Sequence, residues 1–406
     1  MHYYLLPALT GVTDIELKGF DEFLRLSPTK IQINGTEYEL KKDKRNWADN
    51  FGFQLIERPQ GNYLSVLKIS PPDLSLELSR YRTVKKISKM FTEDRDESWR
   101  SYEIKNILER WLLALANDGG DGDPIFSLSY EKSPANSKMK SEFIEKGMNG
   151  DHYVQLILSS VTKMKNNIIK DPITITIKDN VGIIVKDSMS IDIDTLPLPQ
   201  NKLLSLMKQN PNKEDLTAMM LRYASLLPGG QQWSVPKSIY EYLMTNYKVD
   251  VEAFASPLNS QIRELGGNFC SLFLDTDAKY GSIGNFFDLS LRGRKAIINP
   301  PFVESLLEKV ADKIINDKAL SKSSLLFIII PEWKDASFYK KFKNANKYLF
   351  DFSLIKGNYH YVDYENKIIK ANFNSHVYIL GGEDYKKIKW IDIRKELLRL
   401  WGNFRI

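Results

Sequence analysis

The sequence contains only one cysteine, Cys270, among its 406 residues. A single cysteine forms no intrachain disulfide and cannot supply a cysteine-rich zinc site. Long apolar runs are also missing: residues 325–330 form one of the longest, far shorter than the roughly 20 residues of a membrane span. The opening MHYYLLPALTG has no basic segment before its short apolar run, which argues against a signal peptide. We therefore expect an intracellular protein without a membrane segment or a bound metal, although nucleus, cytoplasm and viral factory cannot be distinguished.

Internal repeats and low-complexity segments are absent as well, and neither sign of charge is in large excess. Lysine and arginine number 57 and the acidic residues 51, which gives a net charge of +6. This mild basic excess is compatible with a polyanionic partner but does not establish one. Hydrophobic residues make up 43% and charged residues 27%, as in ordinary globular proteins, and the length allows two or three domains.

Residues 1–195 have the pattern of a mixed α+β domain of unknown role. Two alternating runs around Asn34-Gly35 predict a hairpin, and a second strand pair is expected around residues 59–61. Apolar residues at helical spacing predict a helix over 98–115. Alternating residues within 172–194 predict further strands. This domain is a candidate for contact with a protein partner, with substrate, or with a larger assembly.

A connector is expected at residues 196–200, LPLPQ, because two prolines disfavour a helix there. Helices are predicted at 202–208 and 213–227, with Asp215 near the start of the second. We assign residues 196–245 to a helical connector that packs on a catalytic domain. From residue 246 to 406, helices alternate with apolar strands, which predicts a doubly wound α/β domain. The expected strands are 251–255, 295–299, 325–330, 349–355 and 375–382.

The most informative motif is Asn299-Pro300-Pro301-Phe302, which follows an apolar strand and precedes a helical pattern. In an open α/β sheet this position is the carboxyl edge, where ligands bind. An exocyclic aryl amine is a poor nucleophile because its lone pair is delocalised into the ring. The Asn299 side-chain oxygen and the Pro300 carbonyl could accept hydrogen bonds from its two N–H groups and aim the lone pair at a methyl carbon. Phe302 could stack on the base. A proline-stiffened strand exit with Phe302 in the core explains these residues equally well.

The order of the flanking segments matches that of amino-methyltransferases of the DNA type. Pro236 precedes a predicted helix, as in the segment that holds the methionine end of S-adenosylmethionine. The first strand then leads into a loop for the body of the cofactor. That loop has no GxGxG sequence, so other residues must perform its role: Phe254, Ala255, Ser256, Pro257 and Asn259.

Two aspartates lie close together in LDTDAKYGSIG. Asp275 or Asp277 could accept hydrogen bonds from the ribose hydroxyls of a cofactor. A metal site would need more oxygen ligands than this stretch supplies. A polar turn in which Gly281 and Gly284 adopt positive φ is the simpler interpretation.

Four separated motifs, in this order, resemble the phosphorylated-CTD-interacting-factor family. They are ASPLN (255–259), the stretch 268–289, INPPFVESLL (298–307) and LFIIIPEW (326–333). The resemblance extends over Leu221–Gly382, beginning with LRYASLLPGGQQWSVP. No suitable pair of tryptophans indicates the WW domain of the larger members, so recruitment to the polymerase tail is not expected.

The best-known members of that family are cap-specific adenosine N6-methyltransferases. The resemblance therefore implies a Rossmann-like class I methyltransferase domain at the C-terminus, S-adenosylmethionine as cofactor, and capped mRNA as substrate. It implies that the NPPF residues hold the methyl group and the target base together. It also assigns further residues to the RNA substrate: Glu304, Pro331, Glu332, Trp333 and Lys334. Trp333 could stack on a base or on methylguanine, and the alternative is a core tryptophan after a strand.

Other functions fit parts of the same pattern. A DNA adenine N6-methyltransferase would flip its target base and use residues 1–195 for target recognition. A catalytically inactive RNA-binding or assembly subunit is compatible with the missing glycine-rich loop. A protein glutamine methyltransferase is chemically allowed, because a carboxamide nitrogen poses the same problem as an aryl amine, and it ranks last.

Overall fold

The computed structural model describes the backbone of five strands within residues 1–68 and most of the chain from residue 72 onward. The described ranges after residue 71 are 72–92, 98–118, 123–127, 129–179, 181–188, 193–227, 232–289, 291, 293–316, 322–345 and 349–402. The chain divides into two compact units, one formed by Met1–Pro71 with Ser234–Ile406 and the other by Pro72–Trp233.

Five strands before residue 70 form one sheet in the order β1-β4-β5-β3-β2. Their bounds are β1 Tyr4–Leu5, β2 Lys30–Ile33, β3 Thr36–Lys42, β4 Phe53–Glu57 and β5 Tyr63–Lys68. Antiparallel pairing of β2 with β3 and of β4 with β5 confirms the two strand pairs predicted from the sequence. Their connecting residues, including Asn34-Gly35 and residues 59–61, lie outside the described residues.

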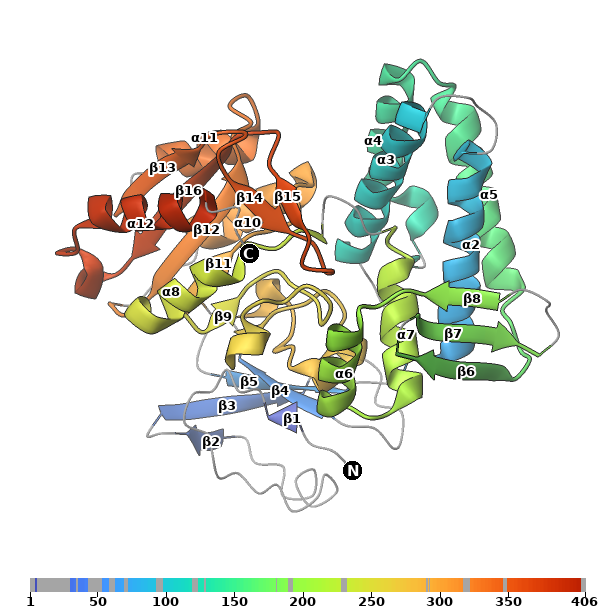
Figure 1. Ribbon diagram of the computed structural model, residues 1–406, viewed down its shortest axis with the longest axis horizontal. Helices are drawn as coiled ribbons and strands as arrows, with labels where there is room; N and C mark the ends of the chain where they lie inside the picture. The colour runs from blue at the N-terminus through green and yellow to red at the C-terminus, as the bar shows by residue number, and fades with distance from the viewer. Residues whose placement is uncertain are drawn as a thin grey trace. The chain divides into compact units, whose positions relative to one another are not determined.

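The unit Pro72–Trp233 begins with four long helices and continues into a three-stranded antiparallel sheet and two further helices (Figure 1). The helices are α2 Leu74–Thr92, α3 Ser98–Asn117, α4 Pro134–Glu145, α5 Gly150–Asn166, α6 Gln200–Gln209 and α7 Lys213–Ala224. The strands are β6 Ile173–Lys178, β7 Gly182–Asp187 and β8 Ile193–Leu196. The predicted helix 98–115 and the strands within 172–194 are confirmed.

A buried ion cluster joins the first and last helices of this unit. Glu77 on α2 is 1% exposed and pairs with Arg80 on the same helix and with Arg222 on α7. The Nε atom of Arg222 lies 2.8 Å from Glu77 Oε1, and Arg80 also pairs with Asp123 at 2.9 Å. Buried charges must be paired in this way because desolvation is costly. α7 is therefore fixed to α2.

This arrangement differs from the connector predicted at residues 196–245. The sequence pattern assigns α6 and α7 to a segment that packs on the catalytic domain, whereas the contacts place them in the same compact unit as α2. The unit ends at Trp233, before the helix α8, Lys237–Tyr247. At the start of α7, the side chain of Asn212 accepts hydrogen bonds from the backbone of Glu214 and Asp215, so Asn212 is the N-cap.

A six-stranded, mostly parallel sheet organises residues 234–406, in the order β10-β9-β11-β12-β16-β13 (Figure 1). Its strands are β9 Val251–Glu252, β10 Asn268–Phe269, β11 Lys295–Ile298, β12 Leu325–Pro331, β13 Phe350–Leu354 and β16 Ser375–Gly381. β10, β9, β11 and β12 are parallel to one another, and β16 is antiparallel to both β12 and β13. The short strands β14 His360–Val362 and β15 Ile368–Lys370 form a separate hairpin. The α/β class predicted for this part of the chain is confirmed.

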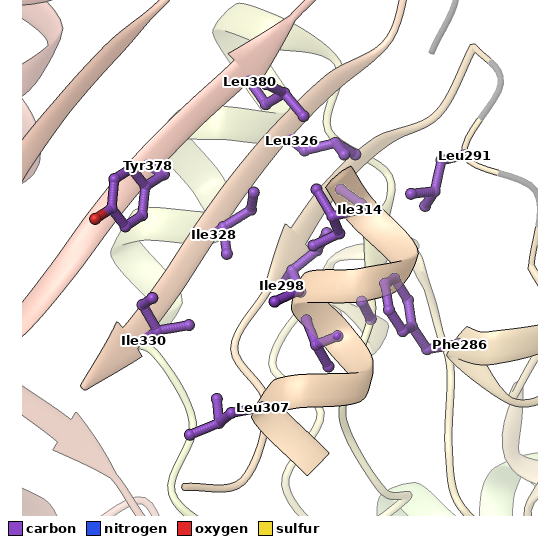
Figure 2. Packing of buried hydrophobic residues seen from close by; sticks show 14 of the residues in the cluster. Phe286, Leu291, Ile298, Leu307, Ile314, Leu326, Ile328, Ile330, Tyr378 and Leu380 are labelled. Carbon is purple, nitrogen blue, oxygen red and sulfur yellow. The ribbon is translucent and has the colours of Figure 1, made fainter. Parts of the chain in front are cut away.

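The central strands carry buried apolar side chains on both faces of the sheet. All seven residues of β12 are buried, as a parallel strand between two helical layers requires. Figure 2 shows Ile328 and Ile330 of this strand on the side of the helix α10, Glu304–Asn316. Leu307 and Ile314 of α10 belong to the same buried cluster. Each fully buried aliphatic side chain contributes roughly 1.5–3 kcal/mol, so this core fixes where the strand ends lie.

The remaining helices complete the unit. They are α9 Leu274–Asp277, α11 Ser337–Asn344 and α12 Trp390–Gly402. Packing of α10 with α11 and of α12 with α8 joins helices that are separate in sequence. No helix among the described residues has the length and apolar character needed to cross a bilayer.

Candidate functional site

The NPPF segment lies where the strand order of the sheet reverses. From β9 the chain first goes to β10 on one side and then returns to β11 on the other side. The register pairs Ile297 of β11 with Glu252 of β9, so both strands end at the same edge. In open α/β sheets, ligands bind at such a reversal, outside the carboxyl ends of the strands. Asn299 follows β11 directly and is 9% exposed.

The two prolines of the motif carry the chain from β11 into α10. Pro300 is buried, whereas Pro301 and Phe302 are partly exposed. The backbone N–H of Val303 donates to the Pro301 carbonyl at 2.8 Å, which closes a tight turn before α10 begins at Glu304. Because each proline ring fixes φ of its own residue, the backbone over Pro300 and Pro301 has little conformational freedom.

The loop after β9 is compact although it lacks the glycine-rich sequence. The Asn259 side-chain oxygen accepts hydrogen bonds from the Ser256 backbone N–H at 2.7 Å and from the Ser256 hydroxyl at 2.9 Å. The backbone N–H of Ala255 donates to the Cys270 carbonyl at 3.0 Å. Side-chain hydrogen bonds thus form the turn over 256–259. This loop and the NPPF segment are brought to one edge of the sheet, as predicted.

Phe254 leaves the strand and packs on two other aromatic rings. Its ring centroid lies 4.8 Å from Phe286 and 6.2 Å from Phe287. Lys313 on α10 holds that segment by donating to the carbonyls of Phe287 and Leu289. Phe254 is partly exposed, so one part of its ring packs on the core and another part meets solvent at the edge of the sheet.

Sequence reasoning did not identify Glu252, the last residue of β9. It is 2% exposed, and Tyr240 on α8 donates to its carboxylate at 2.5 Å. The hydroxyls of Ser234 and Ser260 donate at 3.1 and 2.9 Å, and the backbone N–H of Gln261 donates at 3.2 Å. Burial raises the pKa of the Glu252 carboxyl above its usual value, and the donated hydrogen bonds oppose this rise only in part. A glutamate inside an apolar strand is the only sequence signal that could have indicated it.

Glu252 also fixes the segment that contains Pro236. Pro236 is the N-cap of α8, as its position before a predicted helix suggested. Ser234 is bound on one side to Glu252 and on the other, through two backbone hydrogen bonds of 2.8 and 2.9 Å, to Val362 of β14. The start of α8 is therefore held beside the end of β9.

The two aspartates of LDTDAKYGSIG have different environments. Asp277 is 0% exposed and accepts a hydrogen bond from the Thr276 hydroxyl at 2.8 Å, which indicates a structural role. Asp275 is partly exposed in α9, after β10. Gly281 and Gly284 have φ values of 97° and 105°, as the polar-turn interpretation predicted. Among the described residues, no group of three or more His, Cys, Asp or Glu side chains could hold a metal ion.

Trp333 is an exposed aromatic residue beside the NPPF segment rather than a core residue. It follows Pro331, the last residue of β12, and is 40% exposed. Its ring centroid lies 6.4 Å from that of Phe302, with an interplanar angle of 73°. The structure thus brings together two of the aromatic rings proposed to contact substrate.

The acidic candidates near Trp333 differ in exposure. Glu304 is exposed at the start of α10. The Glu332 side chain is only 11% exposed, with its carboxylate 3.6 Å from the Lys334 ammonium and 3.4 Å from the Ser353 hydroxyl. Lys334 itself is 72% exposed. Glu304 and Lys334 can therefore meet a ligand from solvent, whereas Glu332 is largely covered.

A cluster of lysines follows Trp333 in the sequence, at positions 340–347, and acidic residues of α10 neutralise part of its charge. Lys341 pairs with Glu308 at 2.8 Å and Asp312 at 2.6 Å on α10. The aromatic residues between the lysines belong to the core, with Phe338 and Phe342 both 0% exposed. Residues 234–406 nevertheless hold 26 lysines and arginines against 20 aspartates and glutamates, so the whole net charge of +6 falls on this segment.

The histidines and the cysteine have structural surroundings. His376 lies 2.8 Å from Asp351 and stacks on Tyr378. His360 is 4% exposed, and burial lowers its pKa. Burial raises the pKa of the Cys270 thiol to about 12, so this cysteine is not a nucleophile at neutral pH.

Comparison with known proteins finds relatives over this part of the chain. Residues 204–364 match the family described as "Phosphorylated CTD interacting factor 1 WW domain". A human protein named mRNA (2'-O-methyladenosine-N(6)-)-methyltransferase is 31% identical over 186 residues, which is 43% of this chain and 26% of the human protein. A mouse protein of the same name is 36% identical over 109 residues, 26% of this chain and 15% of the mouse protein.

The chain thus spans about a quarter or less of the length of these relatives. The matched residues 204–364 contain the NPPF segment, the β9 loop and Trp333, which are the features that the structure brings to one edge of the sheet. Over this segment the chain is similar to the phosphorylated CTD interacting factor 1 family, which confirms the resemblance found in the sequence.

Proposed function

We propose that the chain is an S-adenosylmethionine-dependent methyltransferase acting on the N6 amine of adenine, with the first transcribed adenosine of a capped mRNA as acceptor. The observation that carries the proposal is the position of Asn299-Pro300-Pro301-Phe302 at the reversal of the strand order, next to the β9 loop. The names of the human and mouse relatives support RNA adenine as the acceptor class.

The residues at this edge fit a nucleoside cofactor of this kind. The turn 256–259 and the partly exposed Phe254 offer backbone groups and an aromatic surface at the end of β9. Asp275, which follows β10 and is partly exposed, would accept hydrogen bonds from the ribose hydroxyls, whereas Asp277 is buried and accepts from Thr276. Pro236 at the start of α8 would border the methionine end. When bound, S-adenosylmethionine supplies an electrophilic methyl group on a positively charged sulfur.

Asn299 and Pro300 would orient the acceptor nitrogen. The Asn299 side-chain oxygen and the Pro300 carbonyl can accept hydrogen bonds from the two N–H groups of an adenine amine. This favours a more tetrahedral nitrogen whose lone pair is directed away from the two acceptors. Because Asn299 and Pro300 are buried, water competes little for these hydrogen bonds. The proline ring keeps the carbonyl in place, so little reorganisation is needed at transfer.

The proton on the methylated nitrogen needs no strong base in this arrangement. An N-methylated, positively charged amine is acidic and releases its proton readily to water, so the neutral oxygens of Asn299 and Pro300 need only accept hydrogen bonds from the amine. The two histidines of residues 234–406 have contacts elsewhere: His376 pairs with Asp351, and His360 is hydrogen-bonded to the backbone of Trp401. The chemistry therefore depends on positioning.

Trp333, Glu304 and Lys334 would contact the RNA. A tryptophan with 40% of its surface exposed can stack on the cationic methylguanine of a cap. The exposed Glu304 could pair with the edge of that base, and Lys334 with a phosphate. The excess of positive charge in residues 234–406 favours a polyanionic substrate.

The test is methyl transfer from labelled S-adenosylmethionine to matched oligonucleotides. The substrates are capped RNA beginning with adenosine, the same RNA uncapped, capped RNA beginning with guanosine, and duplex DNA. Transfer to the first substrate alone is the expected result. Equal transfer to uncapped RNA would refute cap dependence, and preferential transfer to DNA would overturn the choice of RNA as acceptor.

A further inference from the structure

The carboxyl edge of the sheet continues beyond Trp333. β12 is followed in the sheet by β16 and then by β13. Ser375 of β16 pairs with Pro331 of β12 on one side and with Leu354 of β13 on the other. Trp333 lies two residues after Pro331, and Lys356 lies two residues after Leu354. Both therefore leave the sheet at the same edge, from strands that are roughly 10 Å apart.

Asn374 connects the segments that follow these two strands. Its carbonyl accepts a hydrogen bond from the Glu332 backbone N–H at 3.0 Å. Its side-chain oxygen accepts one from the Lys356 backbone N–H at 2.9 Å. The Ser353 hydroxyl also lies 3.4 Å from the Glu332 carboxylate. The backbone of Lys356 is thus fixed beside the segment that carries Trp333, and its side chain takes no part in these hydrogen bonds.

Apolar side chains are exposed on both of these segments. Among the described residues from 234 onward, the exposed large apolar side chains are Trp333 at 40%, Ile355 at 51% and Ile391 at 46%. Ile391 is on α12, whereas Trp333 and Ile355 come just after the ends of β12 and β13. The exposed surface around Trp333 therefore extends toward β13.

Positive charge accompanies this surface. Lys356 is exposed, and its ammonium forms no ion pair within the part of the chain that the structure describes. Lys370 lies beside the turn that follows, because a Cβ atom on Gly357 would be 3.8 Å from the Lys370 Cε. Lys334 is 72% exposed. Against these three lysines, Asp335 is the exposed acidic residue of the same segments, so the edge is positively charged.

A base stacked on Trp333 would bring phosphates to this edge. Stacking uses the face of a base, so its ribose and phosphates leave from the rim of the stacked rings. In a capped RNA, the cap guanosine is joined to the first transcribed nucleotide through a 5′–5′ triphosphate, which concentrates negative charge in a short bridge. Lysine suits such a group because its ammonium is a compact charge on a flexible stem. The bridge is therefore a suitable ligand for a lysine fixed beside Trp333.

We propose that Lys356 binds the triphosphate bridge of the capped RNA. The inference rests on the proposed function, in which Trp333 receives the cap guanine and Asn299 the acceptor adenine. Phosphates of the RNA body have the same chemistry, and the position of Lys356 favours the bridge. Along the sheet edge, β12 separates Lys356 from Asn299. The bridge is attached to the guanosine at Trp333, whereas the RNA body begins beyond the acceptor adenosine.

The test measures the binding of cap analogues to the full chain by competition. A fluorescent cap dinucleotide, 7-methylguanosine joined to adenosine through a triphosphate, is displaced by the unlabelled dinucleotide, by 7-methyl-GTP, by 7-methylguanosine and by a longer capped RNA. Wild type is compared with Lys356→Ala and Lys356→Arg. Lys387→Ala is the matched control. Lys387 is also exposed, and it follows β16 at the amino edge of the sheet, roughly 20 Å away along the seven residues of β12.

Lys356→Ala should weaken binding of the cap dinucleotide and of 7-methyl-GTP about 5- to 10-fold, between the effects of an exposed ion pair and of a charge-assisted hydrogen bond. Binding of 7-methylguanosine, which has no phosphate, should be unchanged. Lys356→Arg should keep most of the affinity because it keeps the charge. The control should change affinity less than about 2-fold, since its charge is screened by salt over that distance. Urea unfolding should be alike for all variants, because both lysines are exposed.

An equal effect of Lys356→Ala on 7-methylguanosine would overturn the inference, as would no effect on the dinucleotide. An effect confined to the longer RNA would also overturn it, because Lys356 would then contact the RNA body. Methyl transfer to capped RNA without coupling between Lys356 and the bridge refutes the role of Lys356 alone. Coupling in the binding assay without any transfer refutes the proposed function and leaves the phosphate contact. Neither binding nor transfer by wild type refutes both.

Discussion

Removing the buried carboxylate of Glu252 should strongly destabilise the unit that contains the candidate site. One carboxylate oxygen accepts from the hydroxyls of Ser234 and Tyr240, and the other accepts from the Ser260 hydroxyl and from backbone N–H groups, including that of Gln261. Alanine at position 252 would leave these donors buried without their acceptor. Each unsatisfied buried donor costs about 1–3 kcal/mol, although the hydroxyls can partly reorient. We expect a total loss of about 3–5 kcal/mol in the free energy of unfolding.

Glutamine at position 252 should be far better tolerated. Its amide oxygen can occupy the side that faces Ser260 and the backbone N–H groups. A backbone N–H group can only donate, so this side needs a hydrogen-bond acceptor. Its NH₂ group can then face Tyr240 and Ser234, whose hydroxyls are able to accept. Since burial disfavours the charged form of Glu252, loss of the charge itself costs little. We expect Glu252→Gln to lose about 1 kcal/mol, close to Tyr240→Phe, which removes a single donor.

Urea unfolding of the three variants and wild type measures these differences. The ordering should be Glu252→Ala well below Glu252→Gln and Tyr240→Phe, with wild type the most stable. A loss below about 1 kcal/mol for Glu252→Ala would refute the reasoning, since it would mean that the donors find other acceptors without cost.

Asp275→Ala should weaken the affinity for S-adenosylmethionine about 10- to 100-fold in calorimetry, with little change in stability. Asp277→Ala should instead lower the free energy of unfolding by about 1–3 kcal/mol. Equal cofactor affinity of the Asp275 variant and wild type would contradict this division of roles. Burial lowers the pKa of His360 in the folded chain. Below the unfolded-state pKa of about 6.5, the unfolded chain therefore binds a proton more readily than the folded chain does. The free energy of unfolding should fall as pH decreases through about 6.5. His360→Gln should remove this part of the slope between about pH 7 and pH 5, and an unchanged slope would show that His360 is not its source.

The long regular elements of the C-terminal unit were predictable because each has a local signal. The seven buried residues of β12 read as an unbroken apolar run, and α10 carries apolar residues at helical spacing. NPPF was recognisable as a candidate site because a strand pattern precedes it and a helix pattern follows it. Its position at the carboxyl edge of the sheet follows from the strand pattern before it, whereas the reversal of strand order at β9 is known only from the structure.

The features that were missed depend on partners distant in sequence. Nothing around Arg222 indicates that its guanidinium pairs with Glu77, 145 residues earlier, and this pairing places α7 with the preceding helices. The role of Glu252 became visible only when the fold placed the Tyr240 hydroxyl 2.5 Å from its carboxylate. Trp333 could be a core or a surface residue from its sequence context, and its exposure decided between them.

The central claim is that Asn299 orients the acceptor amine, and single-turnover methyl transfer to capped RNA beginning with adenosine tests it most directly. Wild type, Asn299→Ala and the control Asn246→Ala, an exposed asparagine on α8, are compared at saturating S-adenosylmethionine. Loss of one preorganised hydrogen-bonding group in an active site should slow the chemical step of Asn299→Ala by about 10²- to 10³-fold while cofactor affinity changes little. Transfer by Asn299→Ala at the wild-type rate would contradict the account.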